Sequence, residues 1–462
     1  MNIAALLHVT TERQGDDPAF CENGETIDFA LLGAMAGRAA LQFDRLGISN
    51  VVFADHGSSA FPIALFGAAW AGIPFIPVDS SLHQDDLRHL VSELRPVLLI
   101  GDAGSRQSVS GLEGVASVLI DEFVDGVRRG DALPVWRPDP QAPAAVLPRR
   151  DAADLDTISF SHRRLCQLAT YVSGVDQTPG ERLLIARPVQ DARTTVALLA
   201  SVRRGRSTEL DPEPTRAGDD LLAAIEDRGI THLDIVSDRL PSLIAAAQRA
   251  ADRRADASGD ERGDKLGETS DPIAPTLTEV VVGDRPLPAS ILIEAAHVLG
   301  ARVEYGCGLA VTGVAQVRTD AAELVATGVH PHQLAMGLSV VGSSAEVRSK
   351  RGVVALEGRP GDLYLSGPLN PAGDEPVWRS ANLQVRHDSE GWITAETNSF
   401  TGEEQFHPEL IEVLETHDEV CEVSAVAGAG PTQLVVVLEP DATITVPELQ
   451  DWARQQLEGS TN

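Results

Sequence analysis

Cysteine is scarce in this chain, and the few cysteines are far apart. The 462 residues include four of them, Cys21, Cys166, Cys307 and Cys421, each more than a hundred residues from the next. No CxxC pair and no paired metal-ligand spacing is present, so neither a disulfide framework nor a cysteine-based zinc site is predicted. This usage is typical of a reducing compartment, and we expect a cytoplasmic protein.

Positive charge and long apolar runs are also missing. Lys and Arg number 37 against 68 Asp and Glu, which gives a net charge of −31. Such a surface repels phosphate backbones and anionic lipid, so neither nucleic-acid binding nor membrane insertion is expected. The longest apolar run, residues 63–76, is interrupted by Gly67, Gly72 and Pro74 and is too short to span a bilayer. Residues 1–17 lack the basic and apolar segments of a signal peptide.

Glycine and lysine are both absent from residues 148–160, which read PRRDAADLDTISF. A site for a nucleoside triphosphate needs backbone N–H groups that glycine leaves bare, and a lysine or an equivalent cation. Arginines and aspartates occupy this segment instead, so a glycine-rich phosphate loop is excluded here. Ser161, which follows directly in the sequence SHRRL, is predicted to cap the start of a helix.

What the chain does have is an alternation of strand-type and helix-type segments. Strands are predicted at 51–54, 75–78, 97–100, 183–186, 232–236 and 279–282, and helices at 61–71, 84–94, 194–204, 221–227 and 239–249. Alternation of this kind is typical of βαβ units and a parallel sheet, so we predict an α/β fold. At this length the chain exceeds a single core, and more than one domain is expected.

Two segments depart from this alternation. Residues 251–271 read ADRRADASGDERGDKLGETSD, nearly without large apolar side chains, and are predicted to form a flexible acidic surface loop. Between about residues 337 and 397, short strand-type segments separated by glycines predict a small β-rich subdomain. The remaining residues predict a short α+β lobe, with helices at 408–416 and 446–457 and strands at 420–427 and 434–438.

Residues 70–102, WAGIPFIPVDSSLHQDDLRHLVSELRPVLLIGD, resemble the adenylate-forming superfamily, which contains acyl-CoA synthetases, luciferase-like enzymes and the adenylation domains of peptide synthetases. Further segments follow in the family's order: VVGDRPLP at 281–288, EYGCGL at 304–309, GRPGDLYLSGP at 358–368 and PELIEVLETHDEVCEVSAVAG at 408–428. The resemblance covers nearly the whole chain. It implies the acyl-adenylating enzyme fold, with a large AMP-binding-like N-terminal domain over residues 1–397 and a truncated C-terminal lobe over residues 398–462.

This resemblance implies a two-step reaction, in which a carboxylate attacks ATP and the acyl adenylate then passes to a thiol. The residues that serve this reaction in the family are largely replaced here. The glycine-rich phosphate loop falls on residues 148–158, the magnesium-binding glutamate falls on Leu309, and the family's histidine falls on Asp191. Leucine cannot coordinate a hard cation. The family's hinge motif is missing, and its C-terminal lysine would lie beyond residue 462.

Four positions of the family's nucleotide site keep a residue that suits it. Gly283 falls in the family's glycine turn, Tyr305 keeps the ring that stacks on adenine, Gly306 follows it, and Asn382 replaces the aspartate that binds the ribose hydroxyls. These four are the candidate nucleotide-binding positions, although degenerate ones. No catalytic residue, metal ligand or cofactor is predicted, and ATP with magnesium is expected only if the chain is active.

The replaced groups supply much of the family's rate enhancement. Losing one charge-stabilising donor costs about 3–4 kcal/mol in an enzyme's transition state. Several are missing here, and a combined loss of about 8 kcal/mol corresponds to roughly six decades of rate. The apolar positions that form the fold are kept. We therefore predict a catalytically inactive homologue, a pseudoenzyme, that is a scaffold or regulator for a protein partner: a related ligase, a carrier protein or a synthase.

Two alternatives stay open at this point. In the first, the chain is a divergent ATP-dependent acyl-adenylating enzyme or acyl-CoA ligase that uses Arg149 and Arg150 on the phosphates. In the second, it is a binding module that keeps an acyl or aryl pocket, lined from around residues 281–312, and does not use ATP.

Overall fold

The computed structural model describes most of the chain. The described residues are 2–22, 24–55, 57–79, 82–132, 139–149, 156–173, 180–211, 216–258, 273–283, 287–308, 315–328, 334–340, 343–349, 353–366, 379–388, 391–400, 417, 420–426, 433–438, 449 and 452. The helices predicted at 408–416 and 446–457 lie outside these residues, apart from positions 449 and 452.

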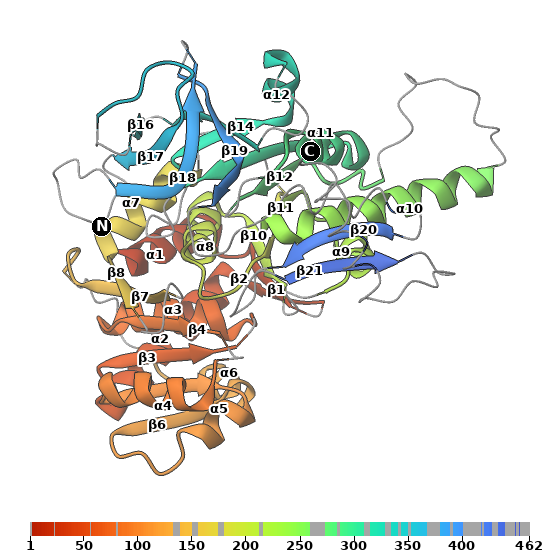
Figure 1. Cartoon of the computed structure of the whole chain (residues 1–462). Coiled ribbons are helices and arrows are strands. Elements are labelled where there is room, and N and C mark those ends of the chain that lie inside the picture. The colour runs from red at the N-terminus through yellow and green to blue at the C-terminus, as the bar shows by residue number, and fades with distance from the viewer. Residues whose placement is uncertain are drawn as a thin grey trace.

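Two large sheets form the framework (Figure 1). The smaller has six strands, all parallel except the last one named, in the order β6 (Val115–Leu119), β5 (Val97–Gly101), β3 (Asn50–Ala54), β4 (Phe75–Val78), β7 (Pro143–Arg149) and β8 (Asp156–Ser161).

The larger sheet has 13 strands and is parallel only in its middle. Its order is β16 (Ser344–Arg348), β17 (Gly361–Ser366), β18 (Arg379–His387), β19 (Ile393–Phe400), β15 (Leu334–Ser339), β14 (Val317–Asp320), β13 (Arg302–Cys307), β12 (Glu279–Val282), β11 (His232–Ile235), β9 (Arg182–Ala186), β10 (Ser207–Leu210), β1 (Pro18–Glu22) and β2 (Glu25–Asp28). The run from β13 to β1 is parallel, and every other pairing is antiparallel.

Helices fill the space between the two sheets and cover the outer face of each. The buried layer between the sheets contains α1 (Ile3–Gln14), α2 (Phe29–Leu46), α3 (Ala60–Ala71), α6 (Ile120–Val127), α7 (His162–Ser173) and α8 (Ala192–Arg204). The outer face of the smaller sheet is covered by α4 (Gln84–Glu93) and α5 (Ala103–Ser108). The outer face of the larger sheet is covered by α9 (Gly218–Arg228), a 3-10 turn (Ser237–Arg239), α10 (Leu240–Ser258), α11 (Ala289–Leu299) and α12 (Ala321–Thr327).

Successive strand residues divide between the cores on the two faces of each sheet. In β3, Val51 and Phe53 join the core between the sheets, while Val52 and Ala54 join the core under α4. A parallel strand that is covered on both faces has to be apolar throughout, which explains the unbroken apolar runs that predicted these strands. The predicted α/β fold with parallel, helix-covered sheets is confirmed.

The acidic loop predicted at residues 251–271 is partly wrong, because α10 continues to Ser258. Charged residues just before this segment and at its start pair with the neighbouring helix α9. Arg249 lies 2.7 Å from a carboxylate oxygen of Asp219, and Arg254 lies 2.9 Å from one of Glu226. Alanine and arginine are also good helix formers, so polar composition alone was a poor reason to predict a loop here. Residues 259–271 lie outside the description.

Strands are confirmed within the region predicted as β-rich. Strands β16 to β19 pair antiparallel with one another, and β15 joins them to β14 of the larger sheet. Strand β19 runs across the predicted boundary between residues 397 and 398, and the division into domains stays a prediction. The strands expected at 420–427 and 434–438 are confirmed as an antiparallel pair, β20 (Val420–Val426) and β21 (Gln433–Leu438).

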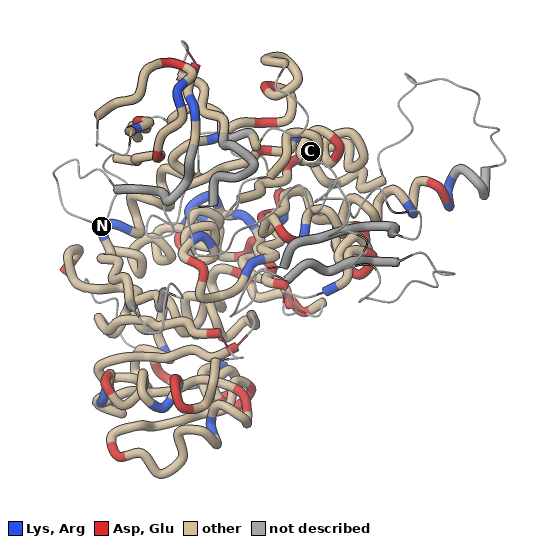
Figure 2. Tube along the Cα trace, in the orientation of Figure 1, with Lys and Arg blue, Asp and Glu red and all other residues tan. Residues whose placement is uncertain are grey.

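Acidic positions are spread over the described chain, and Figure 2 shows them on the helices and at the strand ends of both sheets. Basic positions lie among them rather than on one face. Within the described residues, no helix combines the length and the apolar character needed to cross a bilayer.

Candidate functional site

The segment at the position of the family's phosphate loop lies in a hairpin of the smaller sheet. Strands β7 and β8 pair antiparallel, with Leu147 opposite Ile158 and Arg149 opposite Asp156. Residues 150–155, which connect them and include Arg150, lie outside the description, as does the side chain of Arg149. The hairpin leads directly into α7, so any phosphate held there would meet the start of this helix.

Backbone N–H groups at the start of α7 are taken by the chain itself. His162 N–H donates to the carbonyl oxygen of Ala142 at 3.2 Å, and Arg163 N–H donates to that of Pro140 at 2.7 Å. Arg164 N–H donates to Oγ of Ser161 at 3.2 Å, which confirms the predicted serine cap. These are the groups that a helix start offers to an anion. Here they already have acceptors.

The side chain of His162 is fully buried at this helix start. Neither of its ring nitrogens has a hydrogen-bond partner in the described structure. Burial lowers the pKa of His162 to about 4, against an opposing effect of Asp139. The imidazole is therefore neutral near pH 7 and adds no positive charge to the phosphate-loop position.

Gly283 and Gly306 lie side by side where the parallel strands β12 and β13 end. A Cβ atom at Gly283 would lie 2.0 Å from the carbonyl oxygen of Gly306 and 2.3 Å from Nη1 of Arg193. Only glycine fits such a close approach. The structure therefore gives Gly283 a packing role, whether or not a nucleotide also binds beside it.

Tyr305 points to the opposite face of the sheet from the pocket described below. It pairs with Val282 in the sheet, its exposed fraction is 0%, and it belongs to the core under α11. A ring needs an open face to stack on a base, and this ring has none in the structure. Asn382 lies in β18 with its side chain outside the description, and Leu309 is not described. The assignment of these positions to a nucleotide site stays a prediction.

A buried guanidinium lies at the carboxyl ends of three parallel strands. Arg187, 1% exposed, follows β9 and forms an ion pair with Asp234 of β11. Its Nη2 donates to the carbonyl oxygens of Ile235 and Gly283, each at 2.7 Å, and its Nη1 lies 3.3 Å from Asp191. Ligands of open α/β sheets bind in the crevice at this edge. Arg187 occupies part of that edge, and its guanidinium already binds the polar groups around it.

Asp191, at the position of the family's histidine, starts α8. Its side chain accepts the N–H of Arg193 at 2.9 Å as the helix cap and also pairs with Arg187. The cap stabilises the start of α8. The pair with Arg187 connects this helix start to the ends of β9 and β11.

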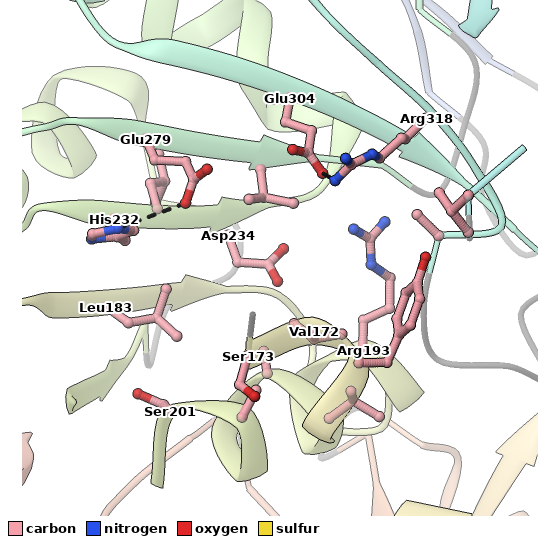
Figure 3. Close-up of a pocket in the computed structure, with 18 of the residues that line it drawn as sticks. Val172, Ser173, Leu183, Arg193, Ser201, His232, Asp234, Glu279, Glu304 and Arg318 are labelled. Atoms are coloured by element: carbon pink, nitrogen blue, oxygen red, sulfur yellow. Dashed lines mark ion pairs between the residues drawn. The ribbon is translucent and has the colours of Figure 1, made fainter. Parts of the chain in front are cut away.

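A cavity of about 590 Å³ lies between α8 and one face of the larger sheet (Figure 3). Sequence reasoning placed an acyl pocket around residues 281–312, and Val281 and Glu304 do line this cavity. Its sheet face is unexpectedly polar. His232, Glu279 and Arg302 form one row across three neighbouring strands, and Asp234, Val281 and Glu304 form the next.

An ion pair lies at the end of the cavity beside Gly306. Arg318 of β14 lies 3.5 Å from Glu304, and Arg193 of α8 donates to the carbonyl oxygen of Gly306 at 3.3 Å. Burial raises the pKa of Glu304, although Arg318 and Arg302 act in the opposite direction. A partly buried carboxylate with a raised pKa in a cavity is a frequent mark of a functional position.

The opposite end of the cavity, the strand-start end, lies where β11, β12 and β13 begin. It is formed by Ser173, Ser201, Arg204, Arg206, His232 and Glu279. His232 lies 3.6 Å from Glu279 and 3.9 Å from Glu181, and Arg206 is bound to Glu181. Burial, followed by the charge of Arg206, lowers the pKa of His232 to about 4.

Sequence reasoning missed these polar residues and also Arg187. A signal for the polar residues was present. HLDI and RVEYGC carry titratable residues at alternate positions, and EVVV begins with one, within strands of the larger sheet that are otherwise apolar. A charge at such a position needs a partner or a polar cavity. Within the described residues, no group of three or more His, Cys, Asp or Glu side chains could hold a metal ion.

Comparison with known proteins gives three kinds of similarity. The family model for "AMP-binding enzyme" matches residues 7–154. Among curated proteins, the chain is 26% identical over 239 residues to a probable non-canonical nonribosomal peptide synthetase, CymA, of Salinispora arenicola, and 26% identical over 246 residues to novobiocin biosynthesis protein H of Streptomyces niveus. Each match covers 50% of this chain, but only 3% and 40% of those two proteins.

Solved structures extend the similarity to the whole fold. The anthranilate CoA ligase AuaEII, in complex with anthranoyl-AMP, has a TM-score of 0.75 at 13% identity over 99% of this chain and 90% of that one. A benzoate CoA ligase from Burkholderia xenovorans has a TM-score of 0.73 at 17% identity over 99% of this chain and 94% of that one. The family model and the curated relatives agree with the ordered motifs of the sequence, so the chain is similar to AMP-binding enzymes, and its fold is that of these CoA ligases.

Proposed function

We propose that this chain has the fold of an acyl-adenylating ligase without its ATP-dependent chemistry, and that it acts as a pseudoenzyme. Its folded body would be a scaffold or regulator for a protein partner, namely a related ligase, a carrier protein or a synthase. Neither ATP nor magnesium is needed for this role.

The observation that carries the proposal is the closed start of α7. A phosphate at this helix would have to displace the carbonyl oxygens of Ala142 and Pro140 from the N–H groups of His162 and Arg163. Pro140 is exposed and Ala142 is partly buried, so water can take up the freed oxygens, and the cost is that of the two hydrogen bonds, about 0.5–1.5 kcal/mol each. That cost opposes phosphate binding before any loss of catalytic charge is counted.

The small number of lysines also supports the loss of ATP-dependent chemistry. The chain contains two lysines, Lys265 and Lys350, and both are far in sequence from the β7–β8 hairpin. Lysine is a usual point charge on a nucleotide's phosphates, as in the P-loop. The basic residues of the hairpin are two arginines, and their side chains lie outside the description. The buried, neutral His162 contributes no charge.

Exchange of radioactive pyrophosphate into ATP tests the loss of adenylation directly. The purified chain is mixed with Mg-ATP and a panel of carboxylic acids that includes benzoate and anthranilate, since two ligases of similar fold carry these names. An active benzoate CoA ligase is the positive control. We expect exchange at the level of the protein-free blank for every acid. Acid-dependent exchange above that blank would show an enzyme.

The alternative is a divergent ATP-dependent acyl-adenylating enzyme. It is favoured by a fold that matches a ligase holding an acyl adenylate over 99% of this chain. In that reading Arg149 and Arg150 would bind the phosphates. The double substitution Arg149→Ala, Arg150→Ala would then abolish any exchange seen in the wild type, whereas unchanged exchange in the double variant would exclude these arginines.

A further inference from the structure

Strand β6 ends the smaller sheet on the side that points away from the larger sheet (Figure 1). Its sequence, VASVL, contains no charged residue, proline or glycine, and its residues pair with β5 without a shift of register. All of its residues are partly exposed. An edge strand of this kind is a template for pairing with another chain, and natural proteins usually prevent such pairing with charges, proline or a bulge.

The other three strands that end the two large sheets carry such protection. Strand β2, with the sequence ETID, has two carboxylates and an irregular register with β1. Strand β16 contains Glu346 and Arg348, and residues 353–355 pair with its last residues. Strand β8 begins with Asp156 and has an irregular register with β7. Among these four edges, β6 is the one without protection.

The middle of β6 presents main-chain groups to the outside of the sheet. Val97 N–H of β5 donates to the carbonyl oxygen of Gly114 at 3.1 Å, and the residues of a parallel ladder face their neighbour strand alternately. Ala116 and Val118 therefore bond to β5, while the N–H and C=O groups of Ser117 point away from it. Within the described residues, no strand pairs with β6 on that side.

A second copy of β6 fits this edge in antiparallel orientation. With Ser117 opposite Ser117 of the second copy, each Ser117 N–H meets a Ser117 carbonyl oxygen. The same register sets Val115 opposite Leu119 and Ala116 opposite Val118, so only apolar or small side chains meet across the interface. This is a two-fold contact, in which both copies use the same surface.

The outward N–H groups at the two ends of β6 already have acceptors in their own chain. Val115 N–H donates to the carbonyl oxygen of Leu112 at 3.4 Å, and Leu119 N–H donates to a carboxylate oxygen of Glu122 at 3.3 Å. The contact between copies therefore depends on the two hydrogen bonds of Ser117 and on the burial of partly exposed apolar side chains. Such a small contact is expected to be weak and reversible.

The charged groups at the two ends of β6 are complementary across this two-fold axis. At the start of the strand, Arg95 is exposed and donates to the carbonyl oxygens of Ser92 and Glu113, but it forms no ion pair within the described residues. At the end of the strand, Asp121 is exposed and likewise forms no ion pair among the described residues. Antiparallel pairing brings Arg95 of each copy towards Asp121 of the other, and the exposed Glu113 towards Arg106.

We propose that β6 is a dimerisation edge, at which two copies of the chain pair antiparallel about a two-fold axis at Ser117 and join their smaller sheets. The proposal goes beyond the proposed function and does not depend on it. Nucleotide binding would contradict the loss of adenylation and leave the dimer standing, whereas a monomeric chain would remove the dimer and leave the loss of adenylation untouched.

Sedimentation equilibrium of the purified chain tests for the dimer. Protein at about 1 to about 200 µM is measured in about 0.15 M NaCl, which screens the repulsion between two chains of net charge −31 beyond roughly 8 Å. The mass is expected to rise with concentration from 49.0 kDa towards twice this value. A wild type that stays monomeric at the highest concentration would overturn the proposal and leave this edge to a strand of another protein.

Substitution of Ser117 tests the position of the interface. Ser117→Pro is expected to raise the dissociation constant about tenfold or more, because both symmetry-related hydrogen bonds lose their donor and the ring takes the place of the partner strand. Proline is tolerated in an edge strand where the N–H points away from the sheet, and circular dichroism checks that the variant folds. Ser117→Ala keeps the N–H and should dimerise like the wild type. Equal dissociation constants for Ser117→Pro and the wild type would place the interface elsewhere.

Exchange of charges tests the antiparallel orientation. Arg95→Glu is expected to weaken the dimer about fivefold, because it brings like charges together at two symmetry-related places. Adding Asp121→Arg restores opposite charges and should recover most of the lost affinity. Within one chain these two residues lie at opposite ends of β6, so recovery requires the second copy. A double variant that dimerises no better than Arg95→Glu would contradict the antiparallel pairing.

Discussion

Arg187 shows how a single buried residue can hold the edge at which ligands bind in similar folds. Its guanidinium connects the ends of β9, β11 and β12 and the start of α8, through Asp191, Asp234 and the carbonyl oxygen of Gly283. A charge buried in this way is stable only with its partners in place. The edge is therefore organised by contacts within the protein.

Replacing Arg187 by leucine should destabilise the fold strongly. Asp234 would stay buried without its cation, beside a partly buried Asp191, and breaking a buried pair in this way costs about 3–5 kcal/mol. Urea unfolding followed by circular dichroism measures the change. The control is Arg106→Ala, which breaks a half-exposed pair with Glu122 at 3.1 Å and should cost less than about 1 kcal/mol. A similar small effect for both variants would contradict the structural role of Arg187.

Stability should fall as the pH drops from about 6.5 towards 4, partly because of His162. Its pKa is about 4 in the folded chain and 6.5 for an ordinary histidine. Between these values the unfolded chain binds a proton that the folded chain does not, so acid favours unfolding. The contribution of one such histidine is up to about 3 kcal/mol.

The free energy of unfolding of His162→Gln, measured in urea from pH 7.5 to 4.5, should therefore depend less on pH than that of the wild type. The matched control is His8→Gln, at a side chain that is 41% exposed and pairs with Glu12 on the surface. Identical pH slopes for the wild type and His162→Gln would contradict the burial of a neutral imidazole.

At the scale of elements, the start of α7 depends on its serine cap. Ser161→Ala removes the acceptor for Arg164 N–H and should cost about 1 kcal/mol, while Ser161→Thr should retain most of the stability. Thermal unfolding of the three proteins gives the comparison. If Ser161→Ala and Ser161→Thr were equally stable, the hydrogen bond from Arg164 N–H to residue 161 would contribute nothing to stability, which would contradict the prediction.

Most elements could be predicted from the sequence because each sheet is buried on both faces. The strand at 279–282 matches β12, and the helix at 61–71 differs from α3 by one residue. Helix α10 was cut short at its charged end, because its partners Asp219 and Glu226 lie on another helix, α9. Contacts between elements are not visible in local composition.

The candidate site was harder to predict for the same reason. The absence of glycine and lysine at residues 148–160 is a local feature and could be read directly. The polar rows that face the cavity arise from the register of β11, β12 and β13, which places His232 beside Glu279 and Glu279 beside Arg302. Register across strands is set by tertiary packing. Nor could sequence alone show that Tyr305 faces the core.

For the whole molecule, fold and chemistry depend on different residues. The fold is held by extensive apolar cores, whereas adenylation in the family depends on a few charged groups. A chain can therefore lose the charged groups that carry the chemistry and keep the apolar cores that hold the fold. The match of 99% of this chain to ligase structures at 13–17% identity is consistent with such a separation.

The central claim is that the phosphate position at the start of α7 is closed. Isothermal titration of the purified chain with Mg-ATP, and separately with AMP, tests it most directly because no acyl substrate has to be guessed. The account predicts no binding of either nucleotide up to millimolar concentration. Micromolar binding of Mg-ATP would contradict it, since the N–H groups of His162 and Arg163 would then have to be available to phosphate.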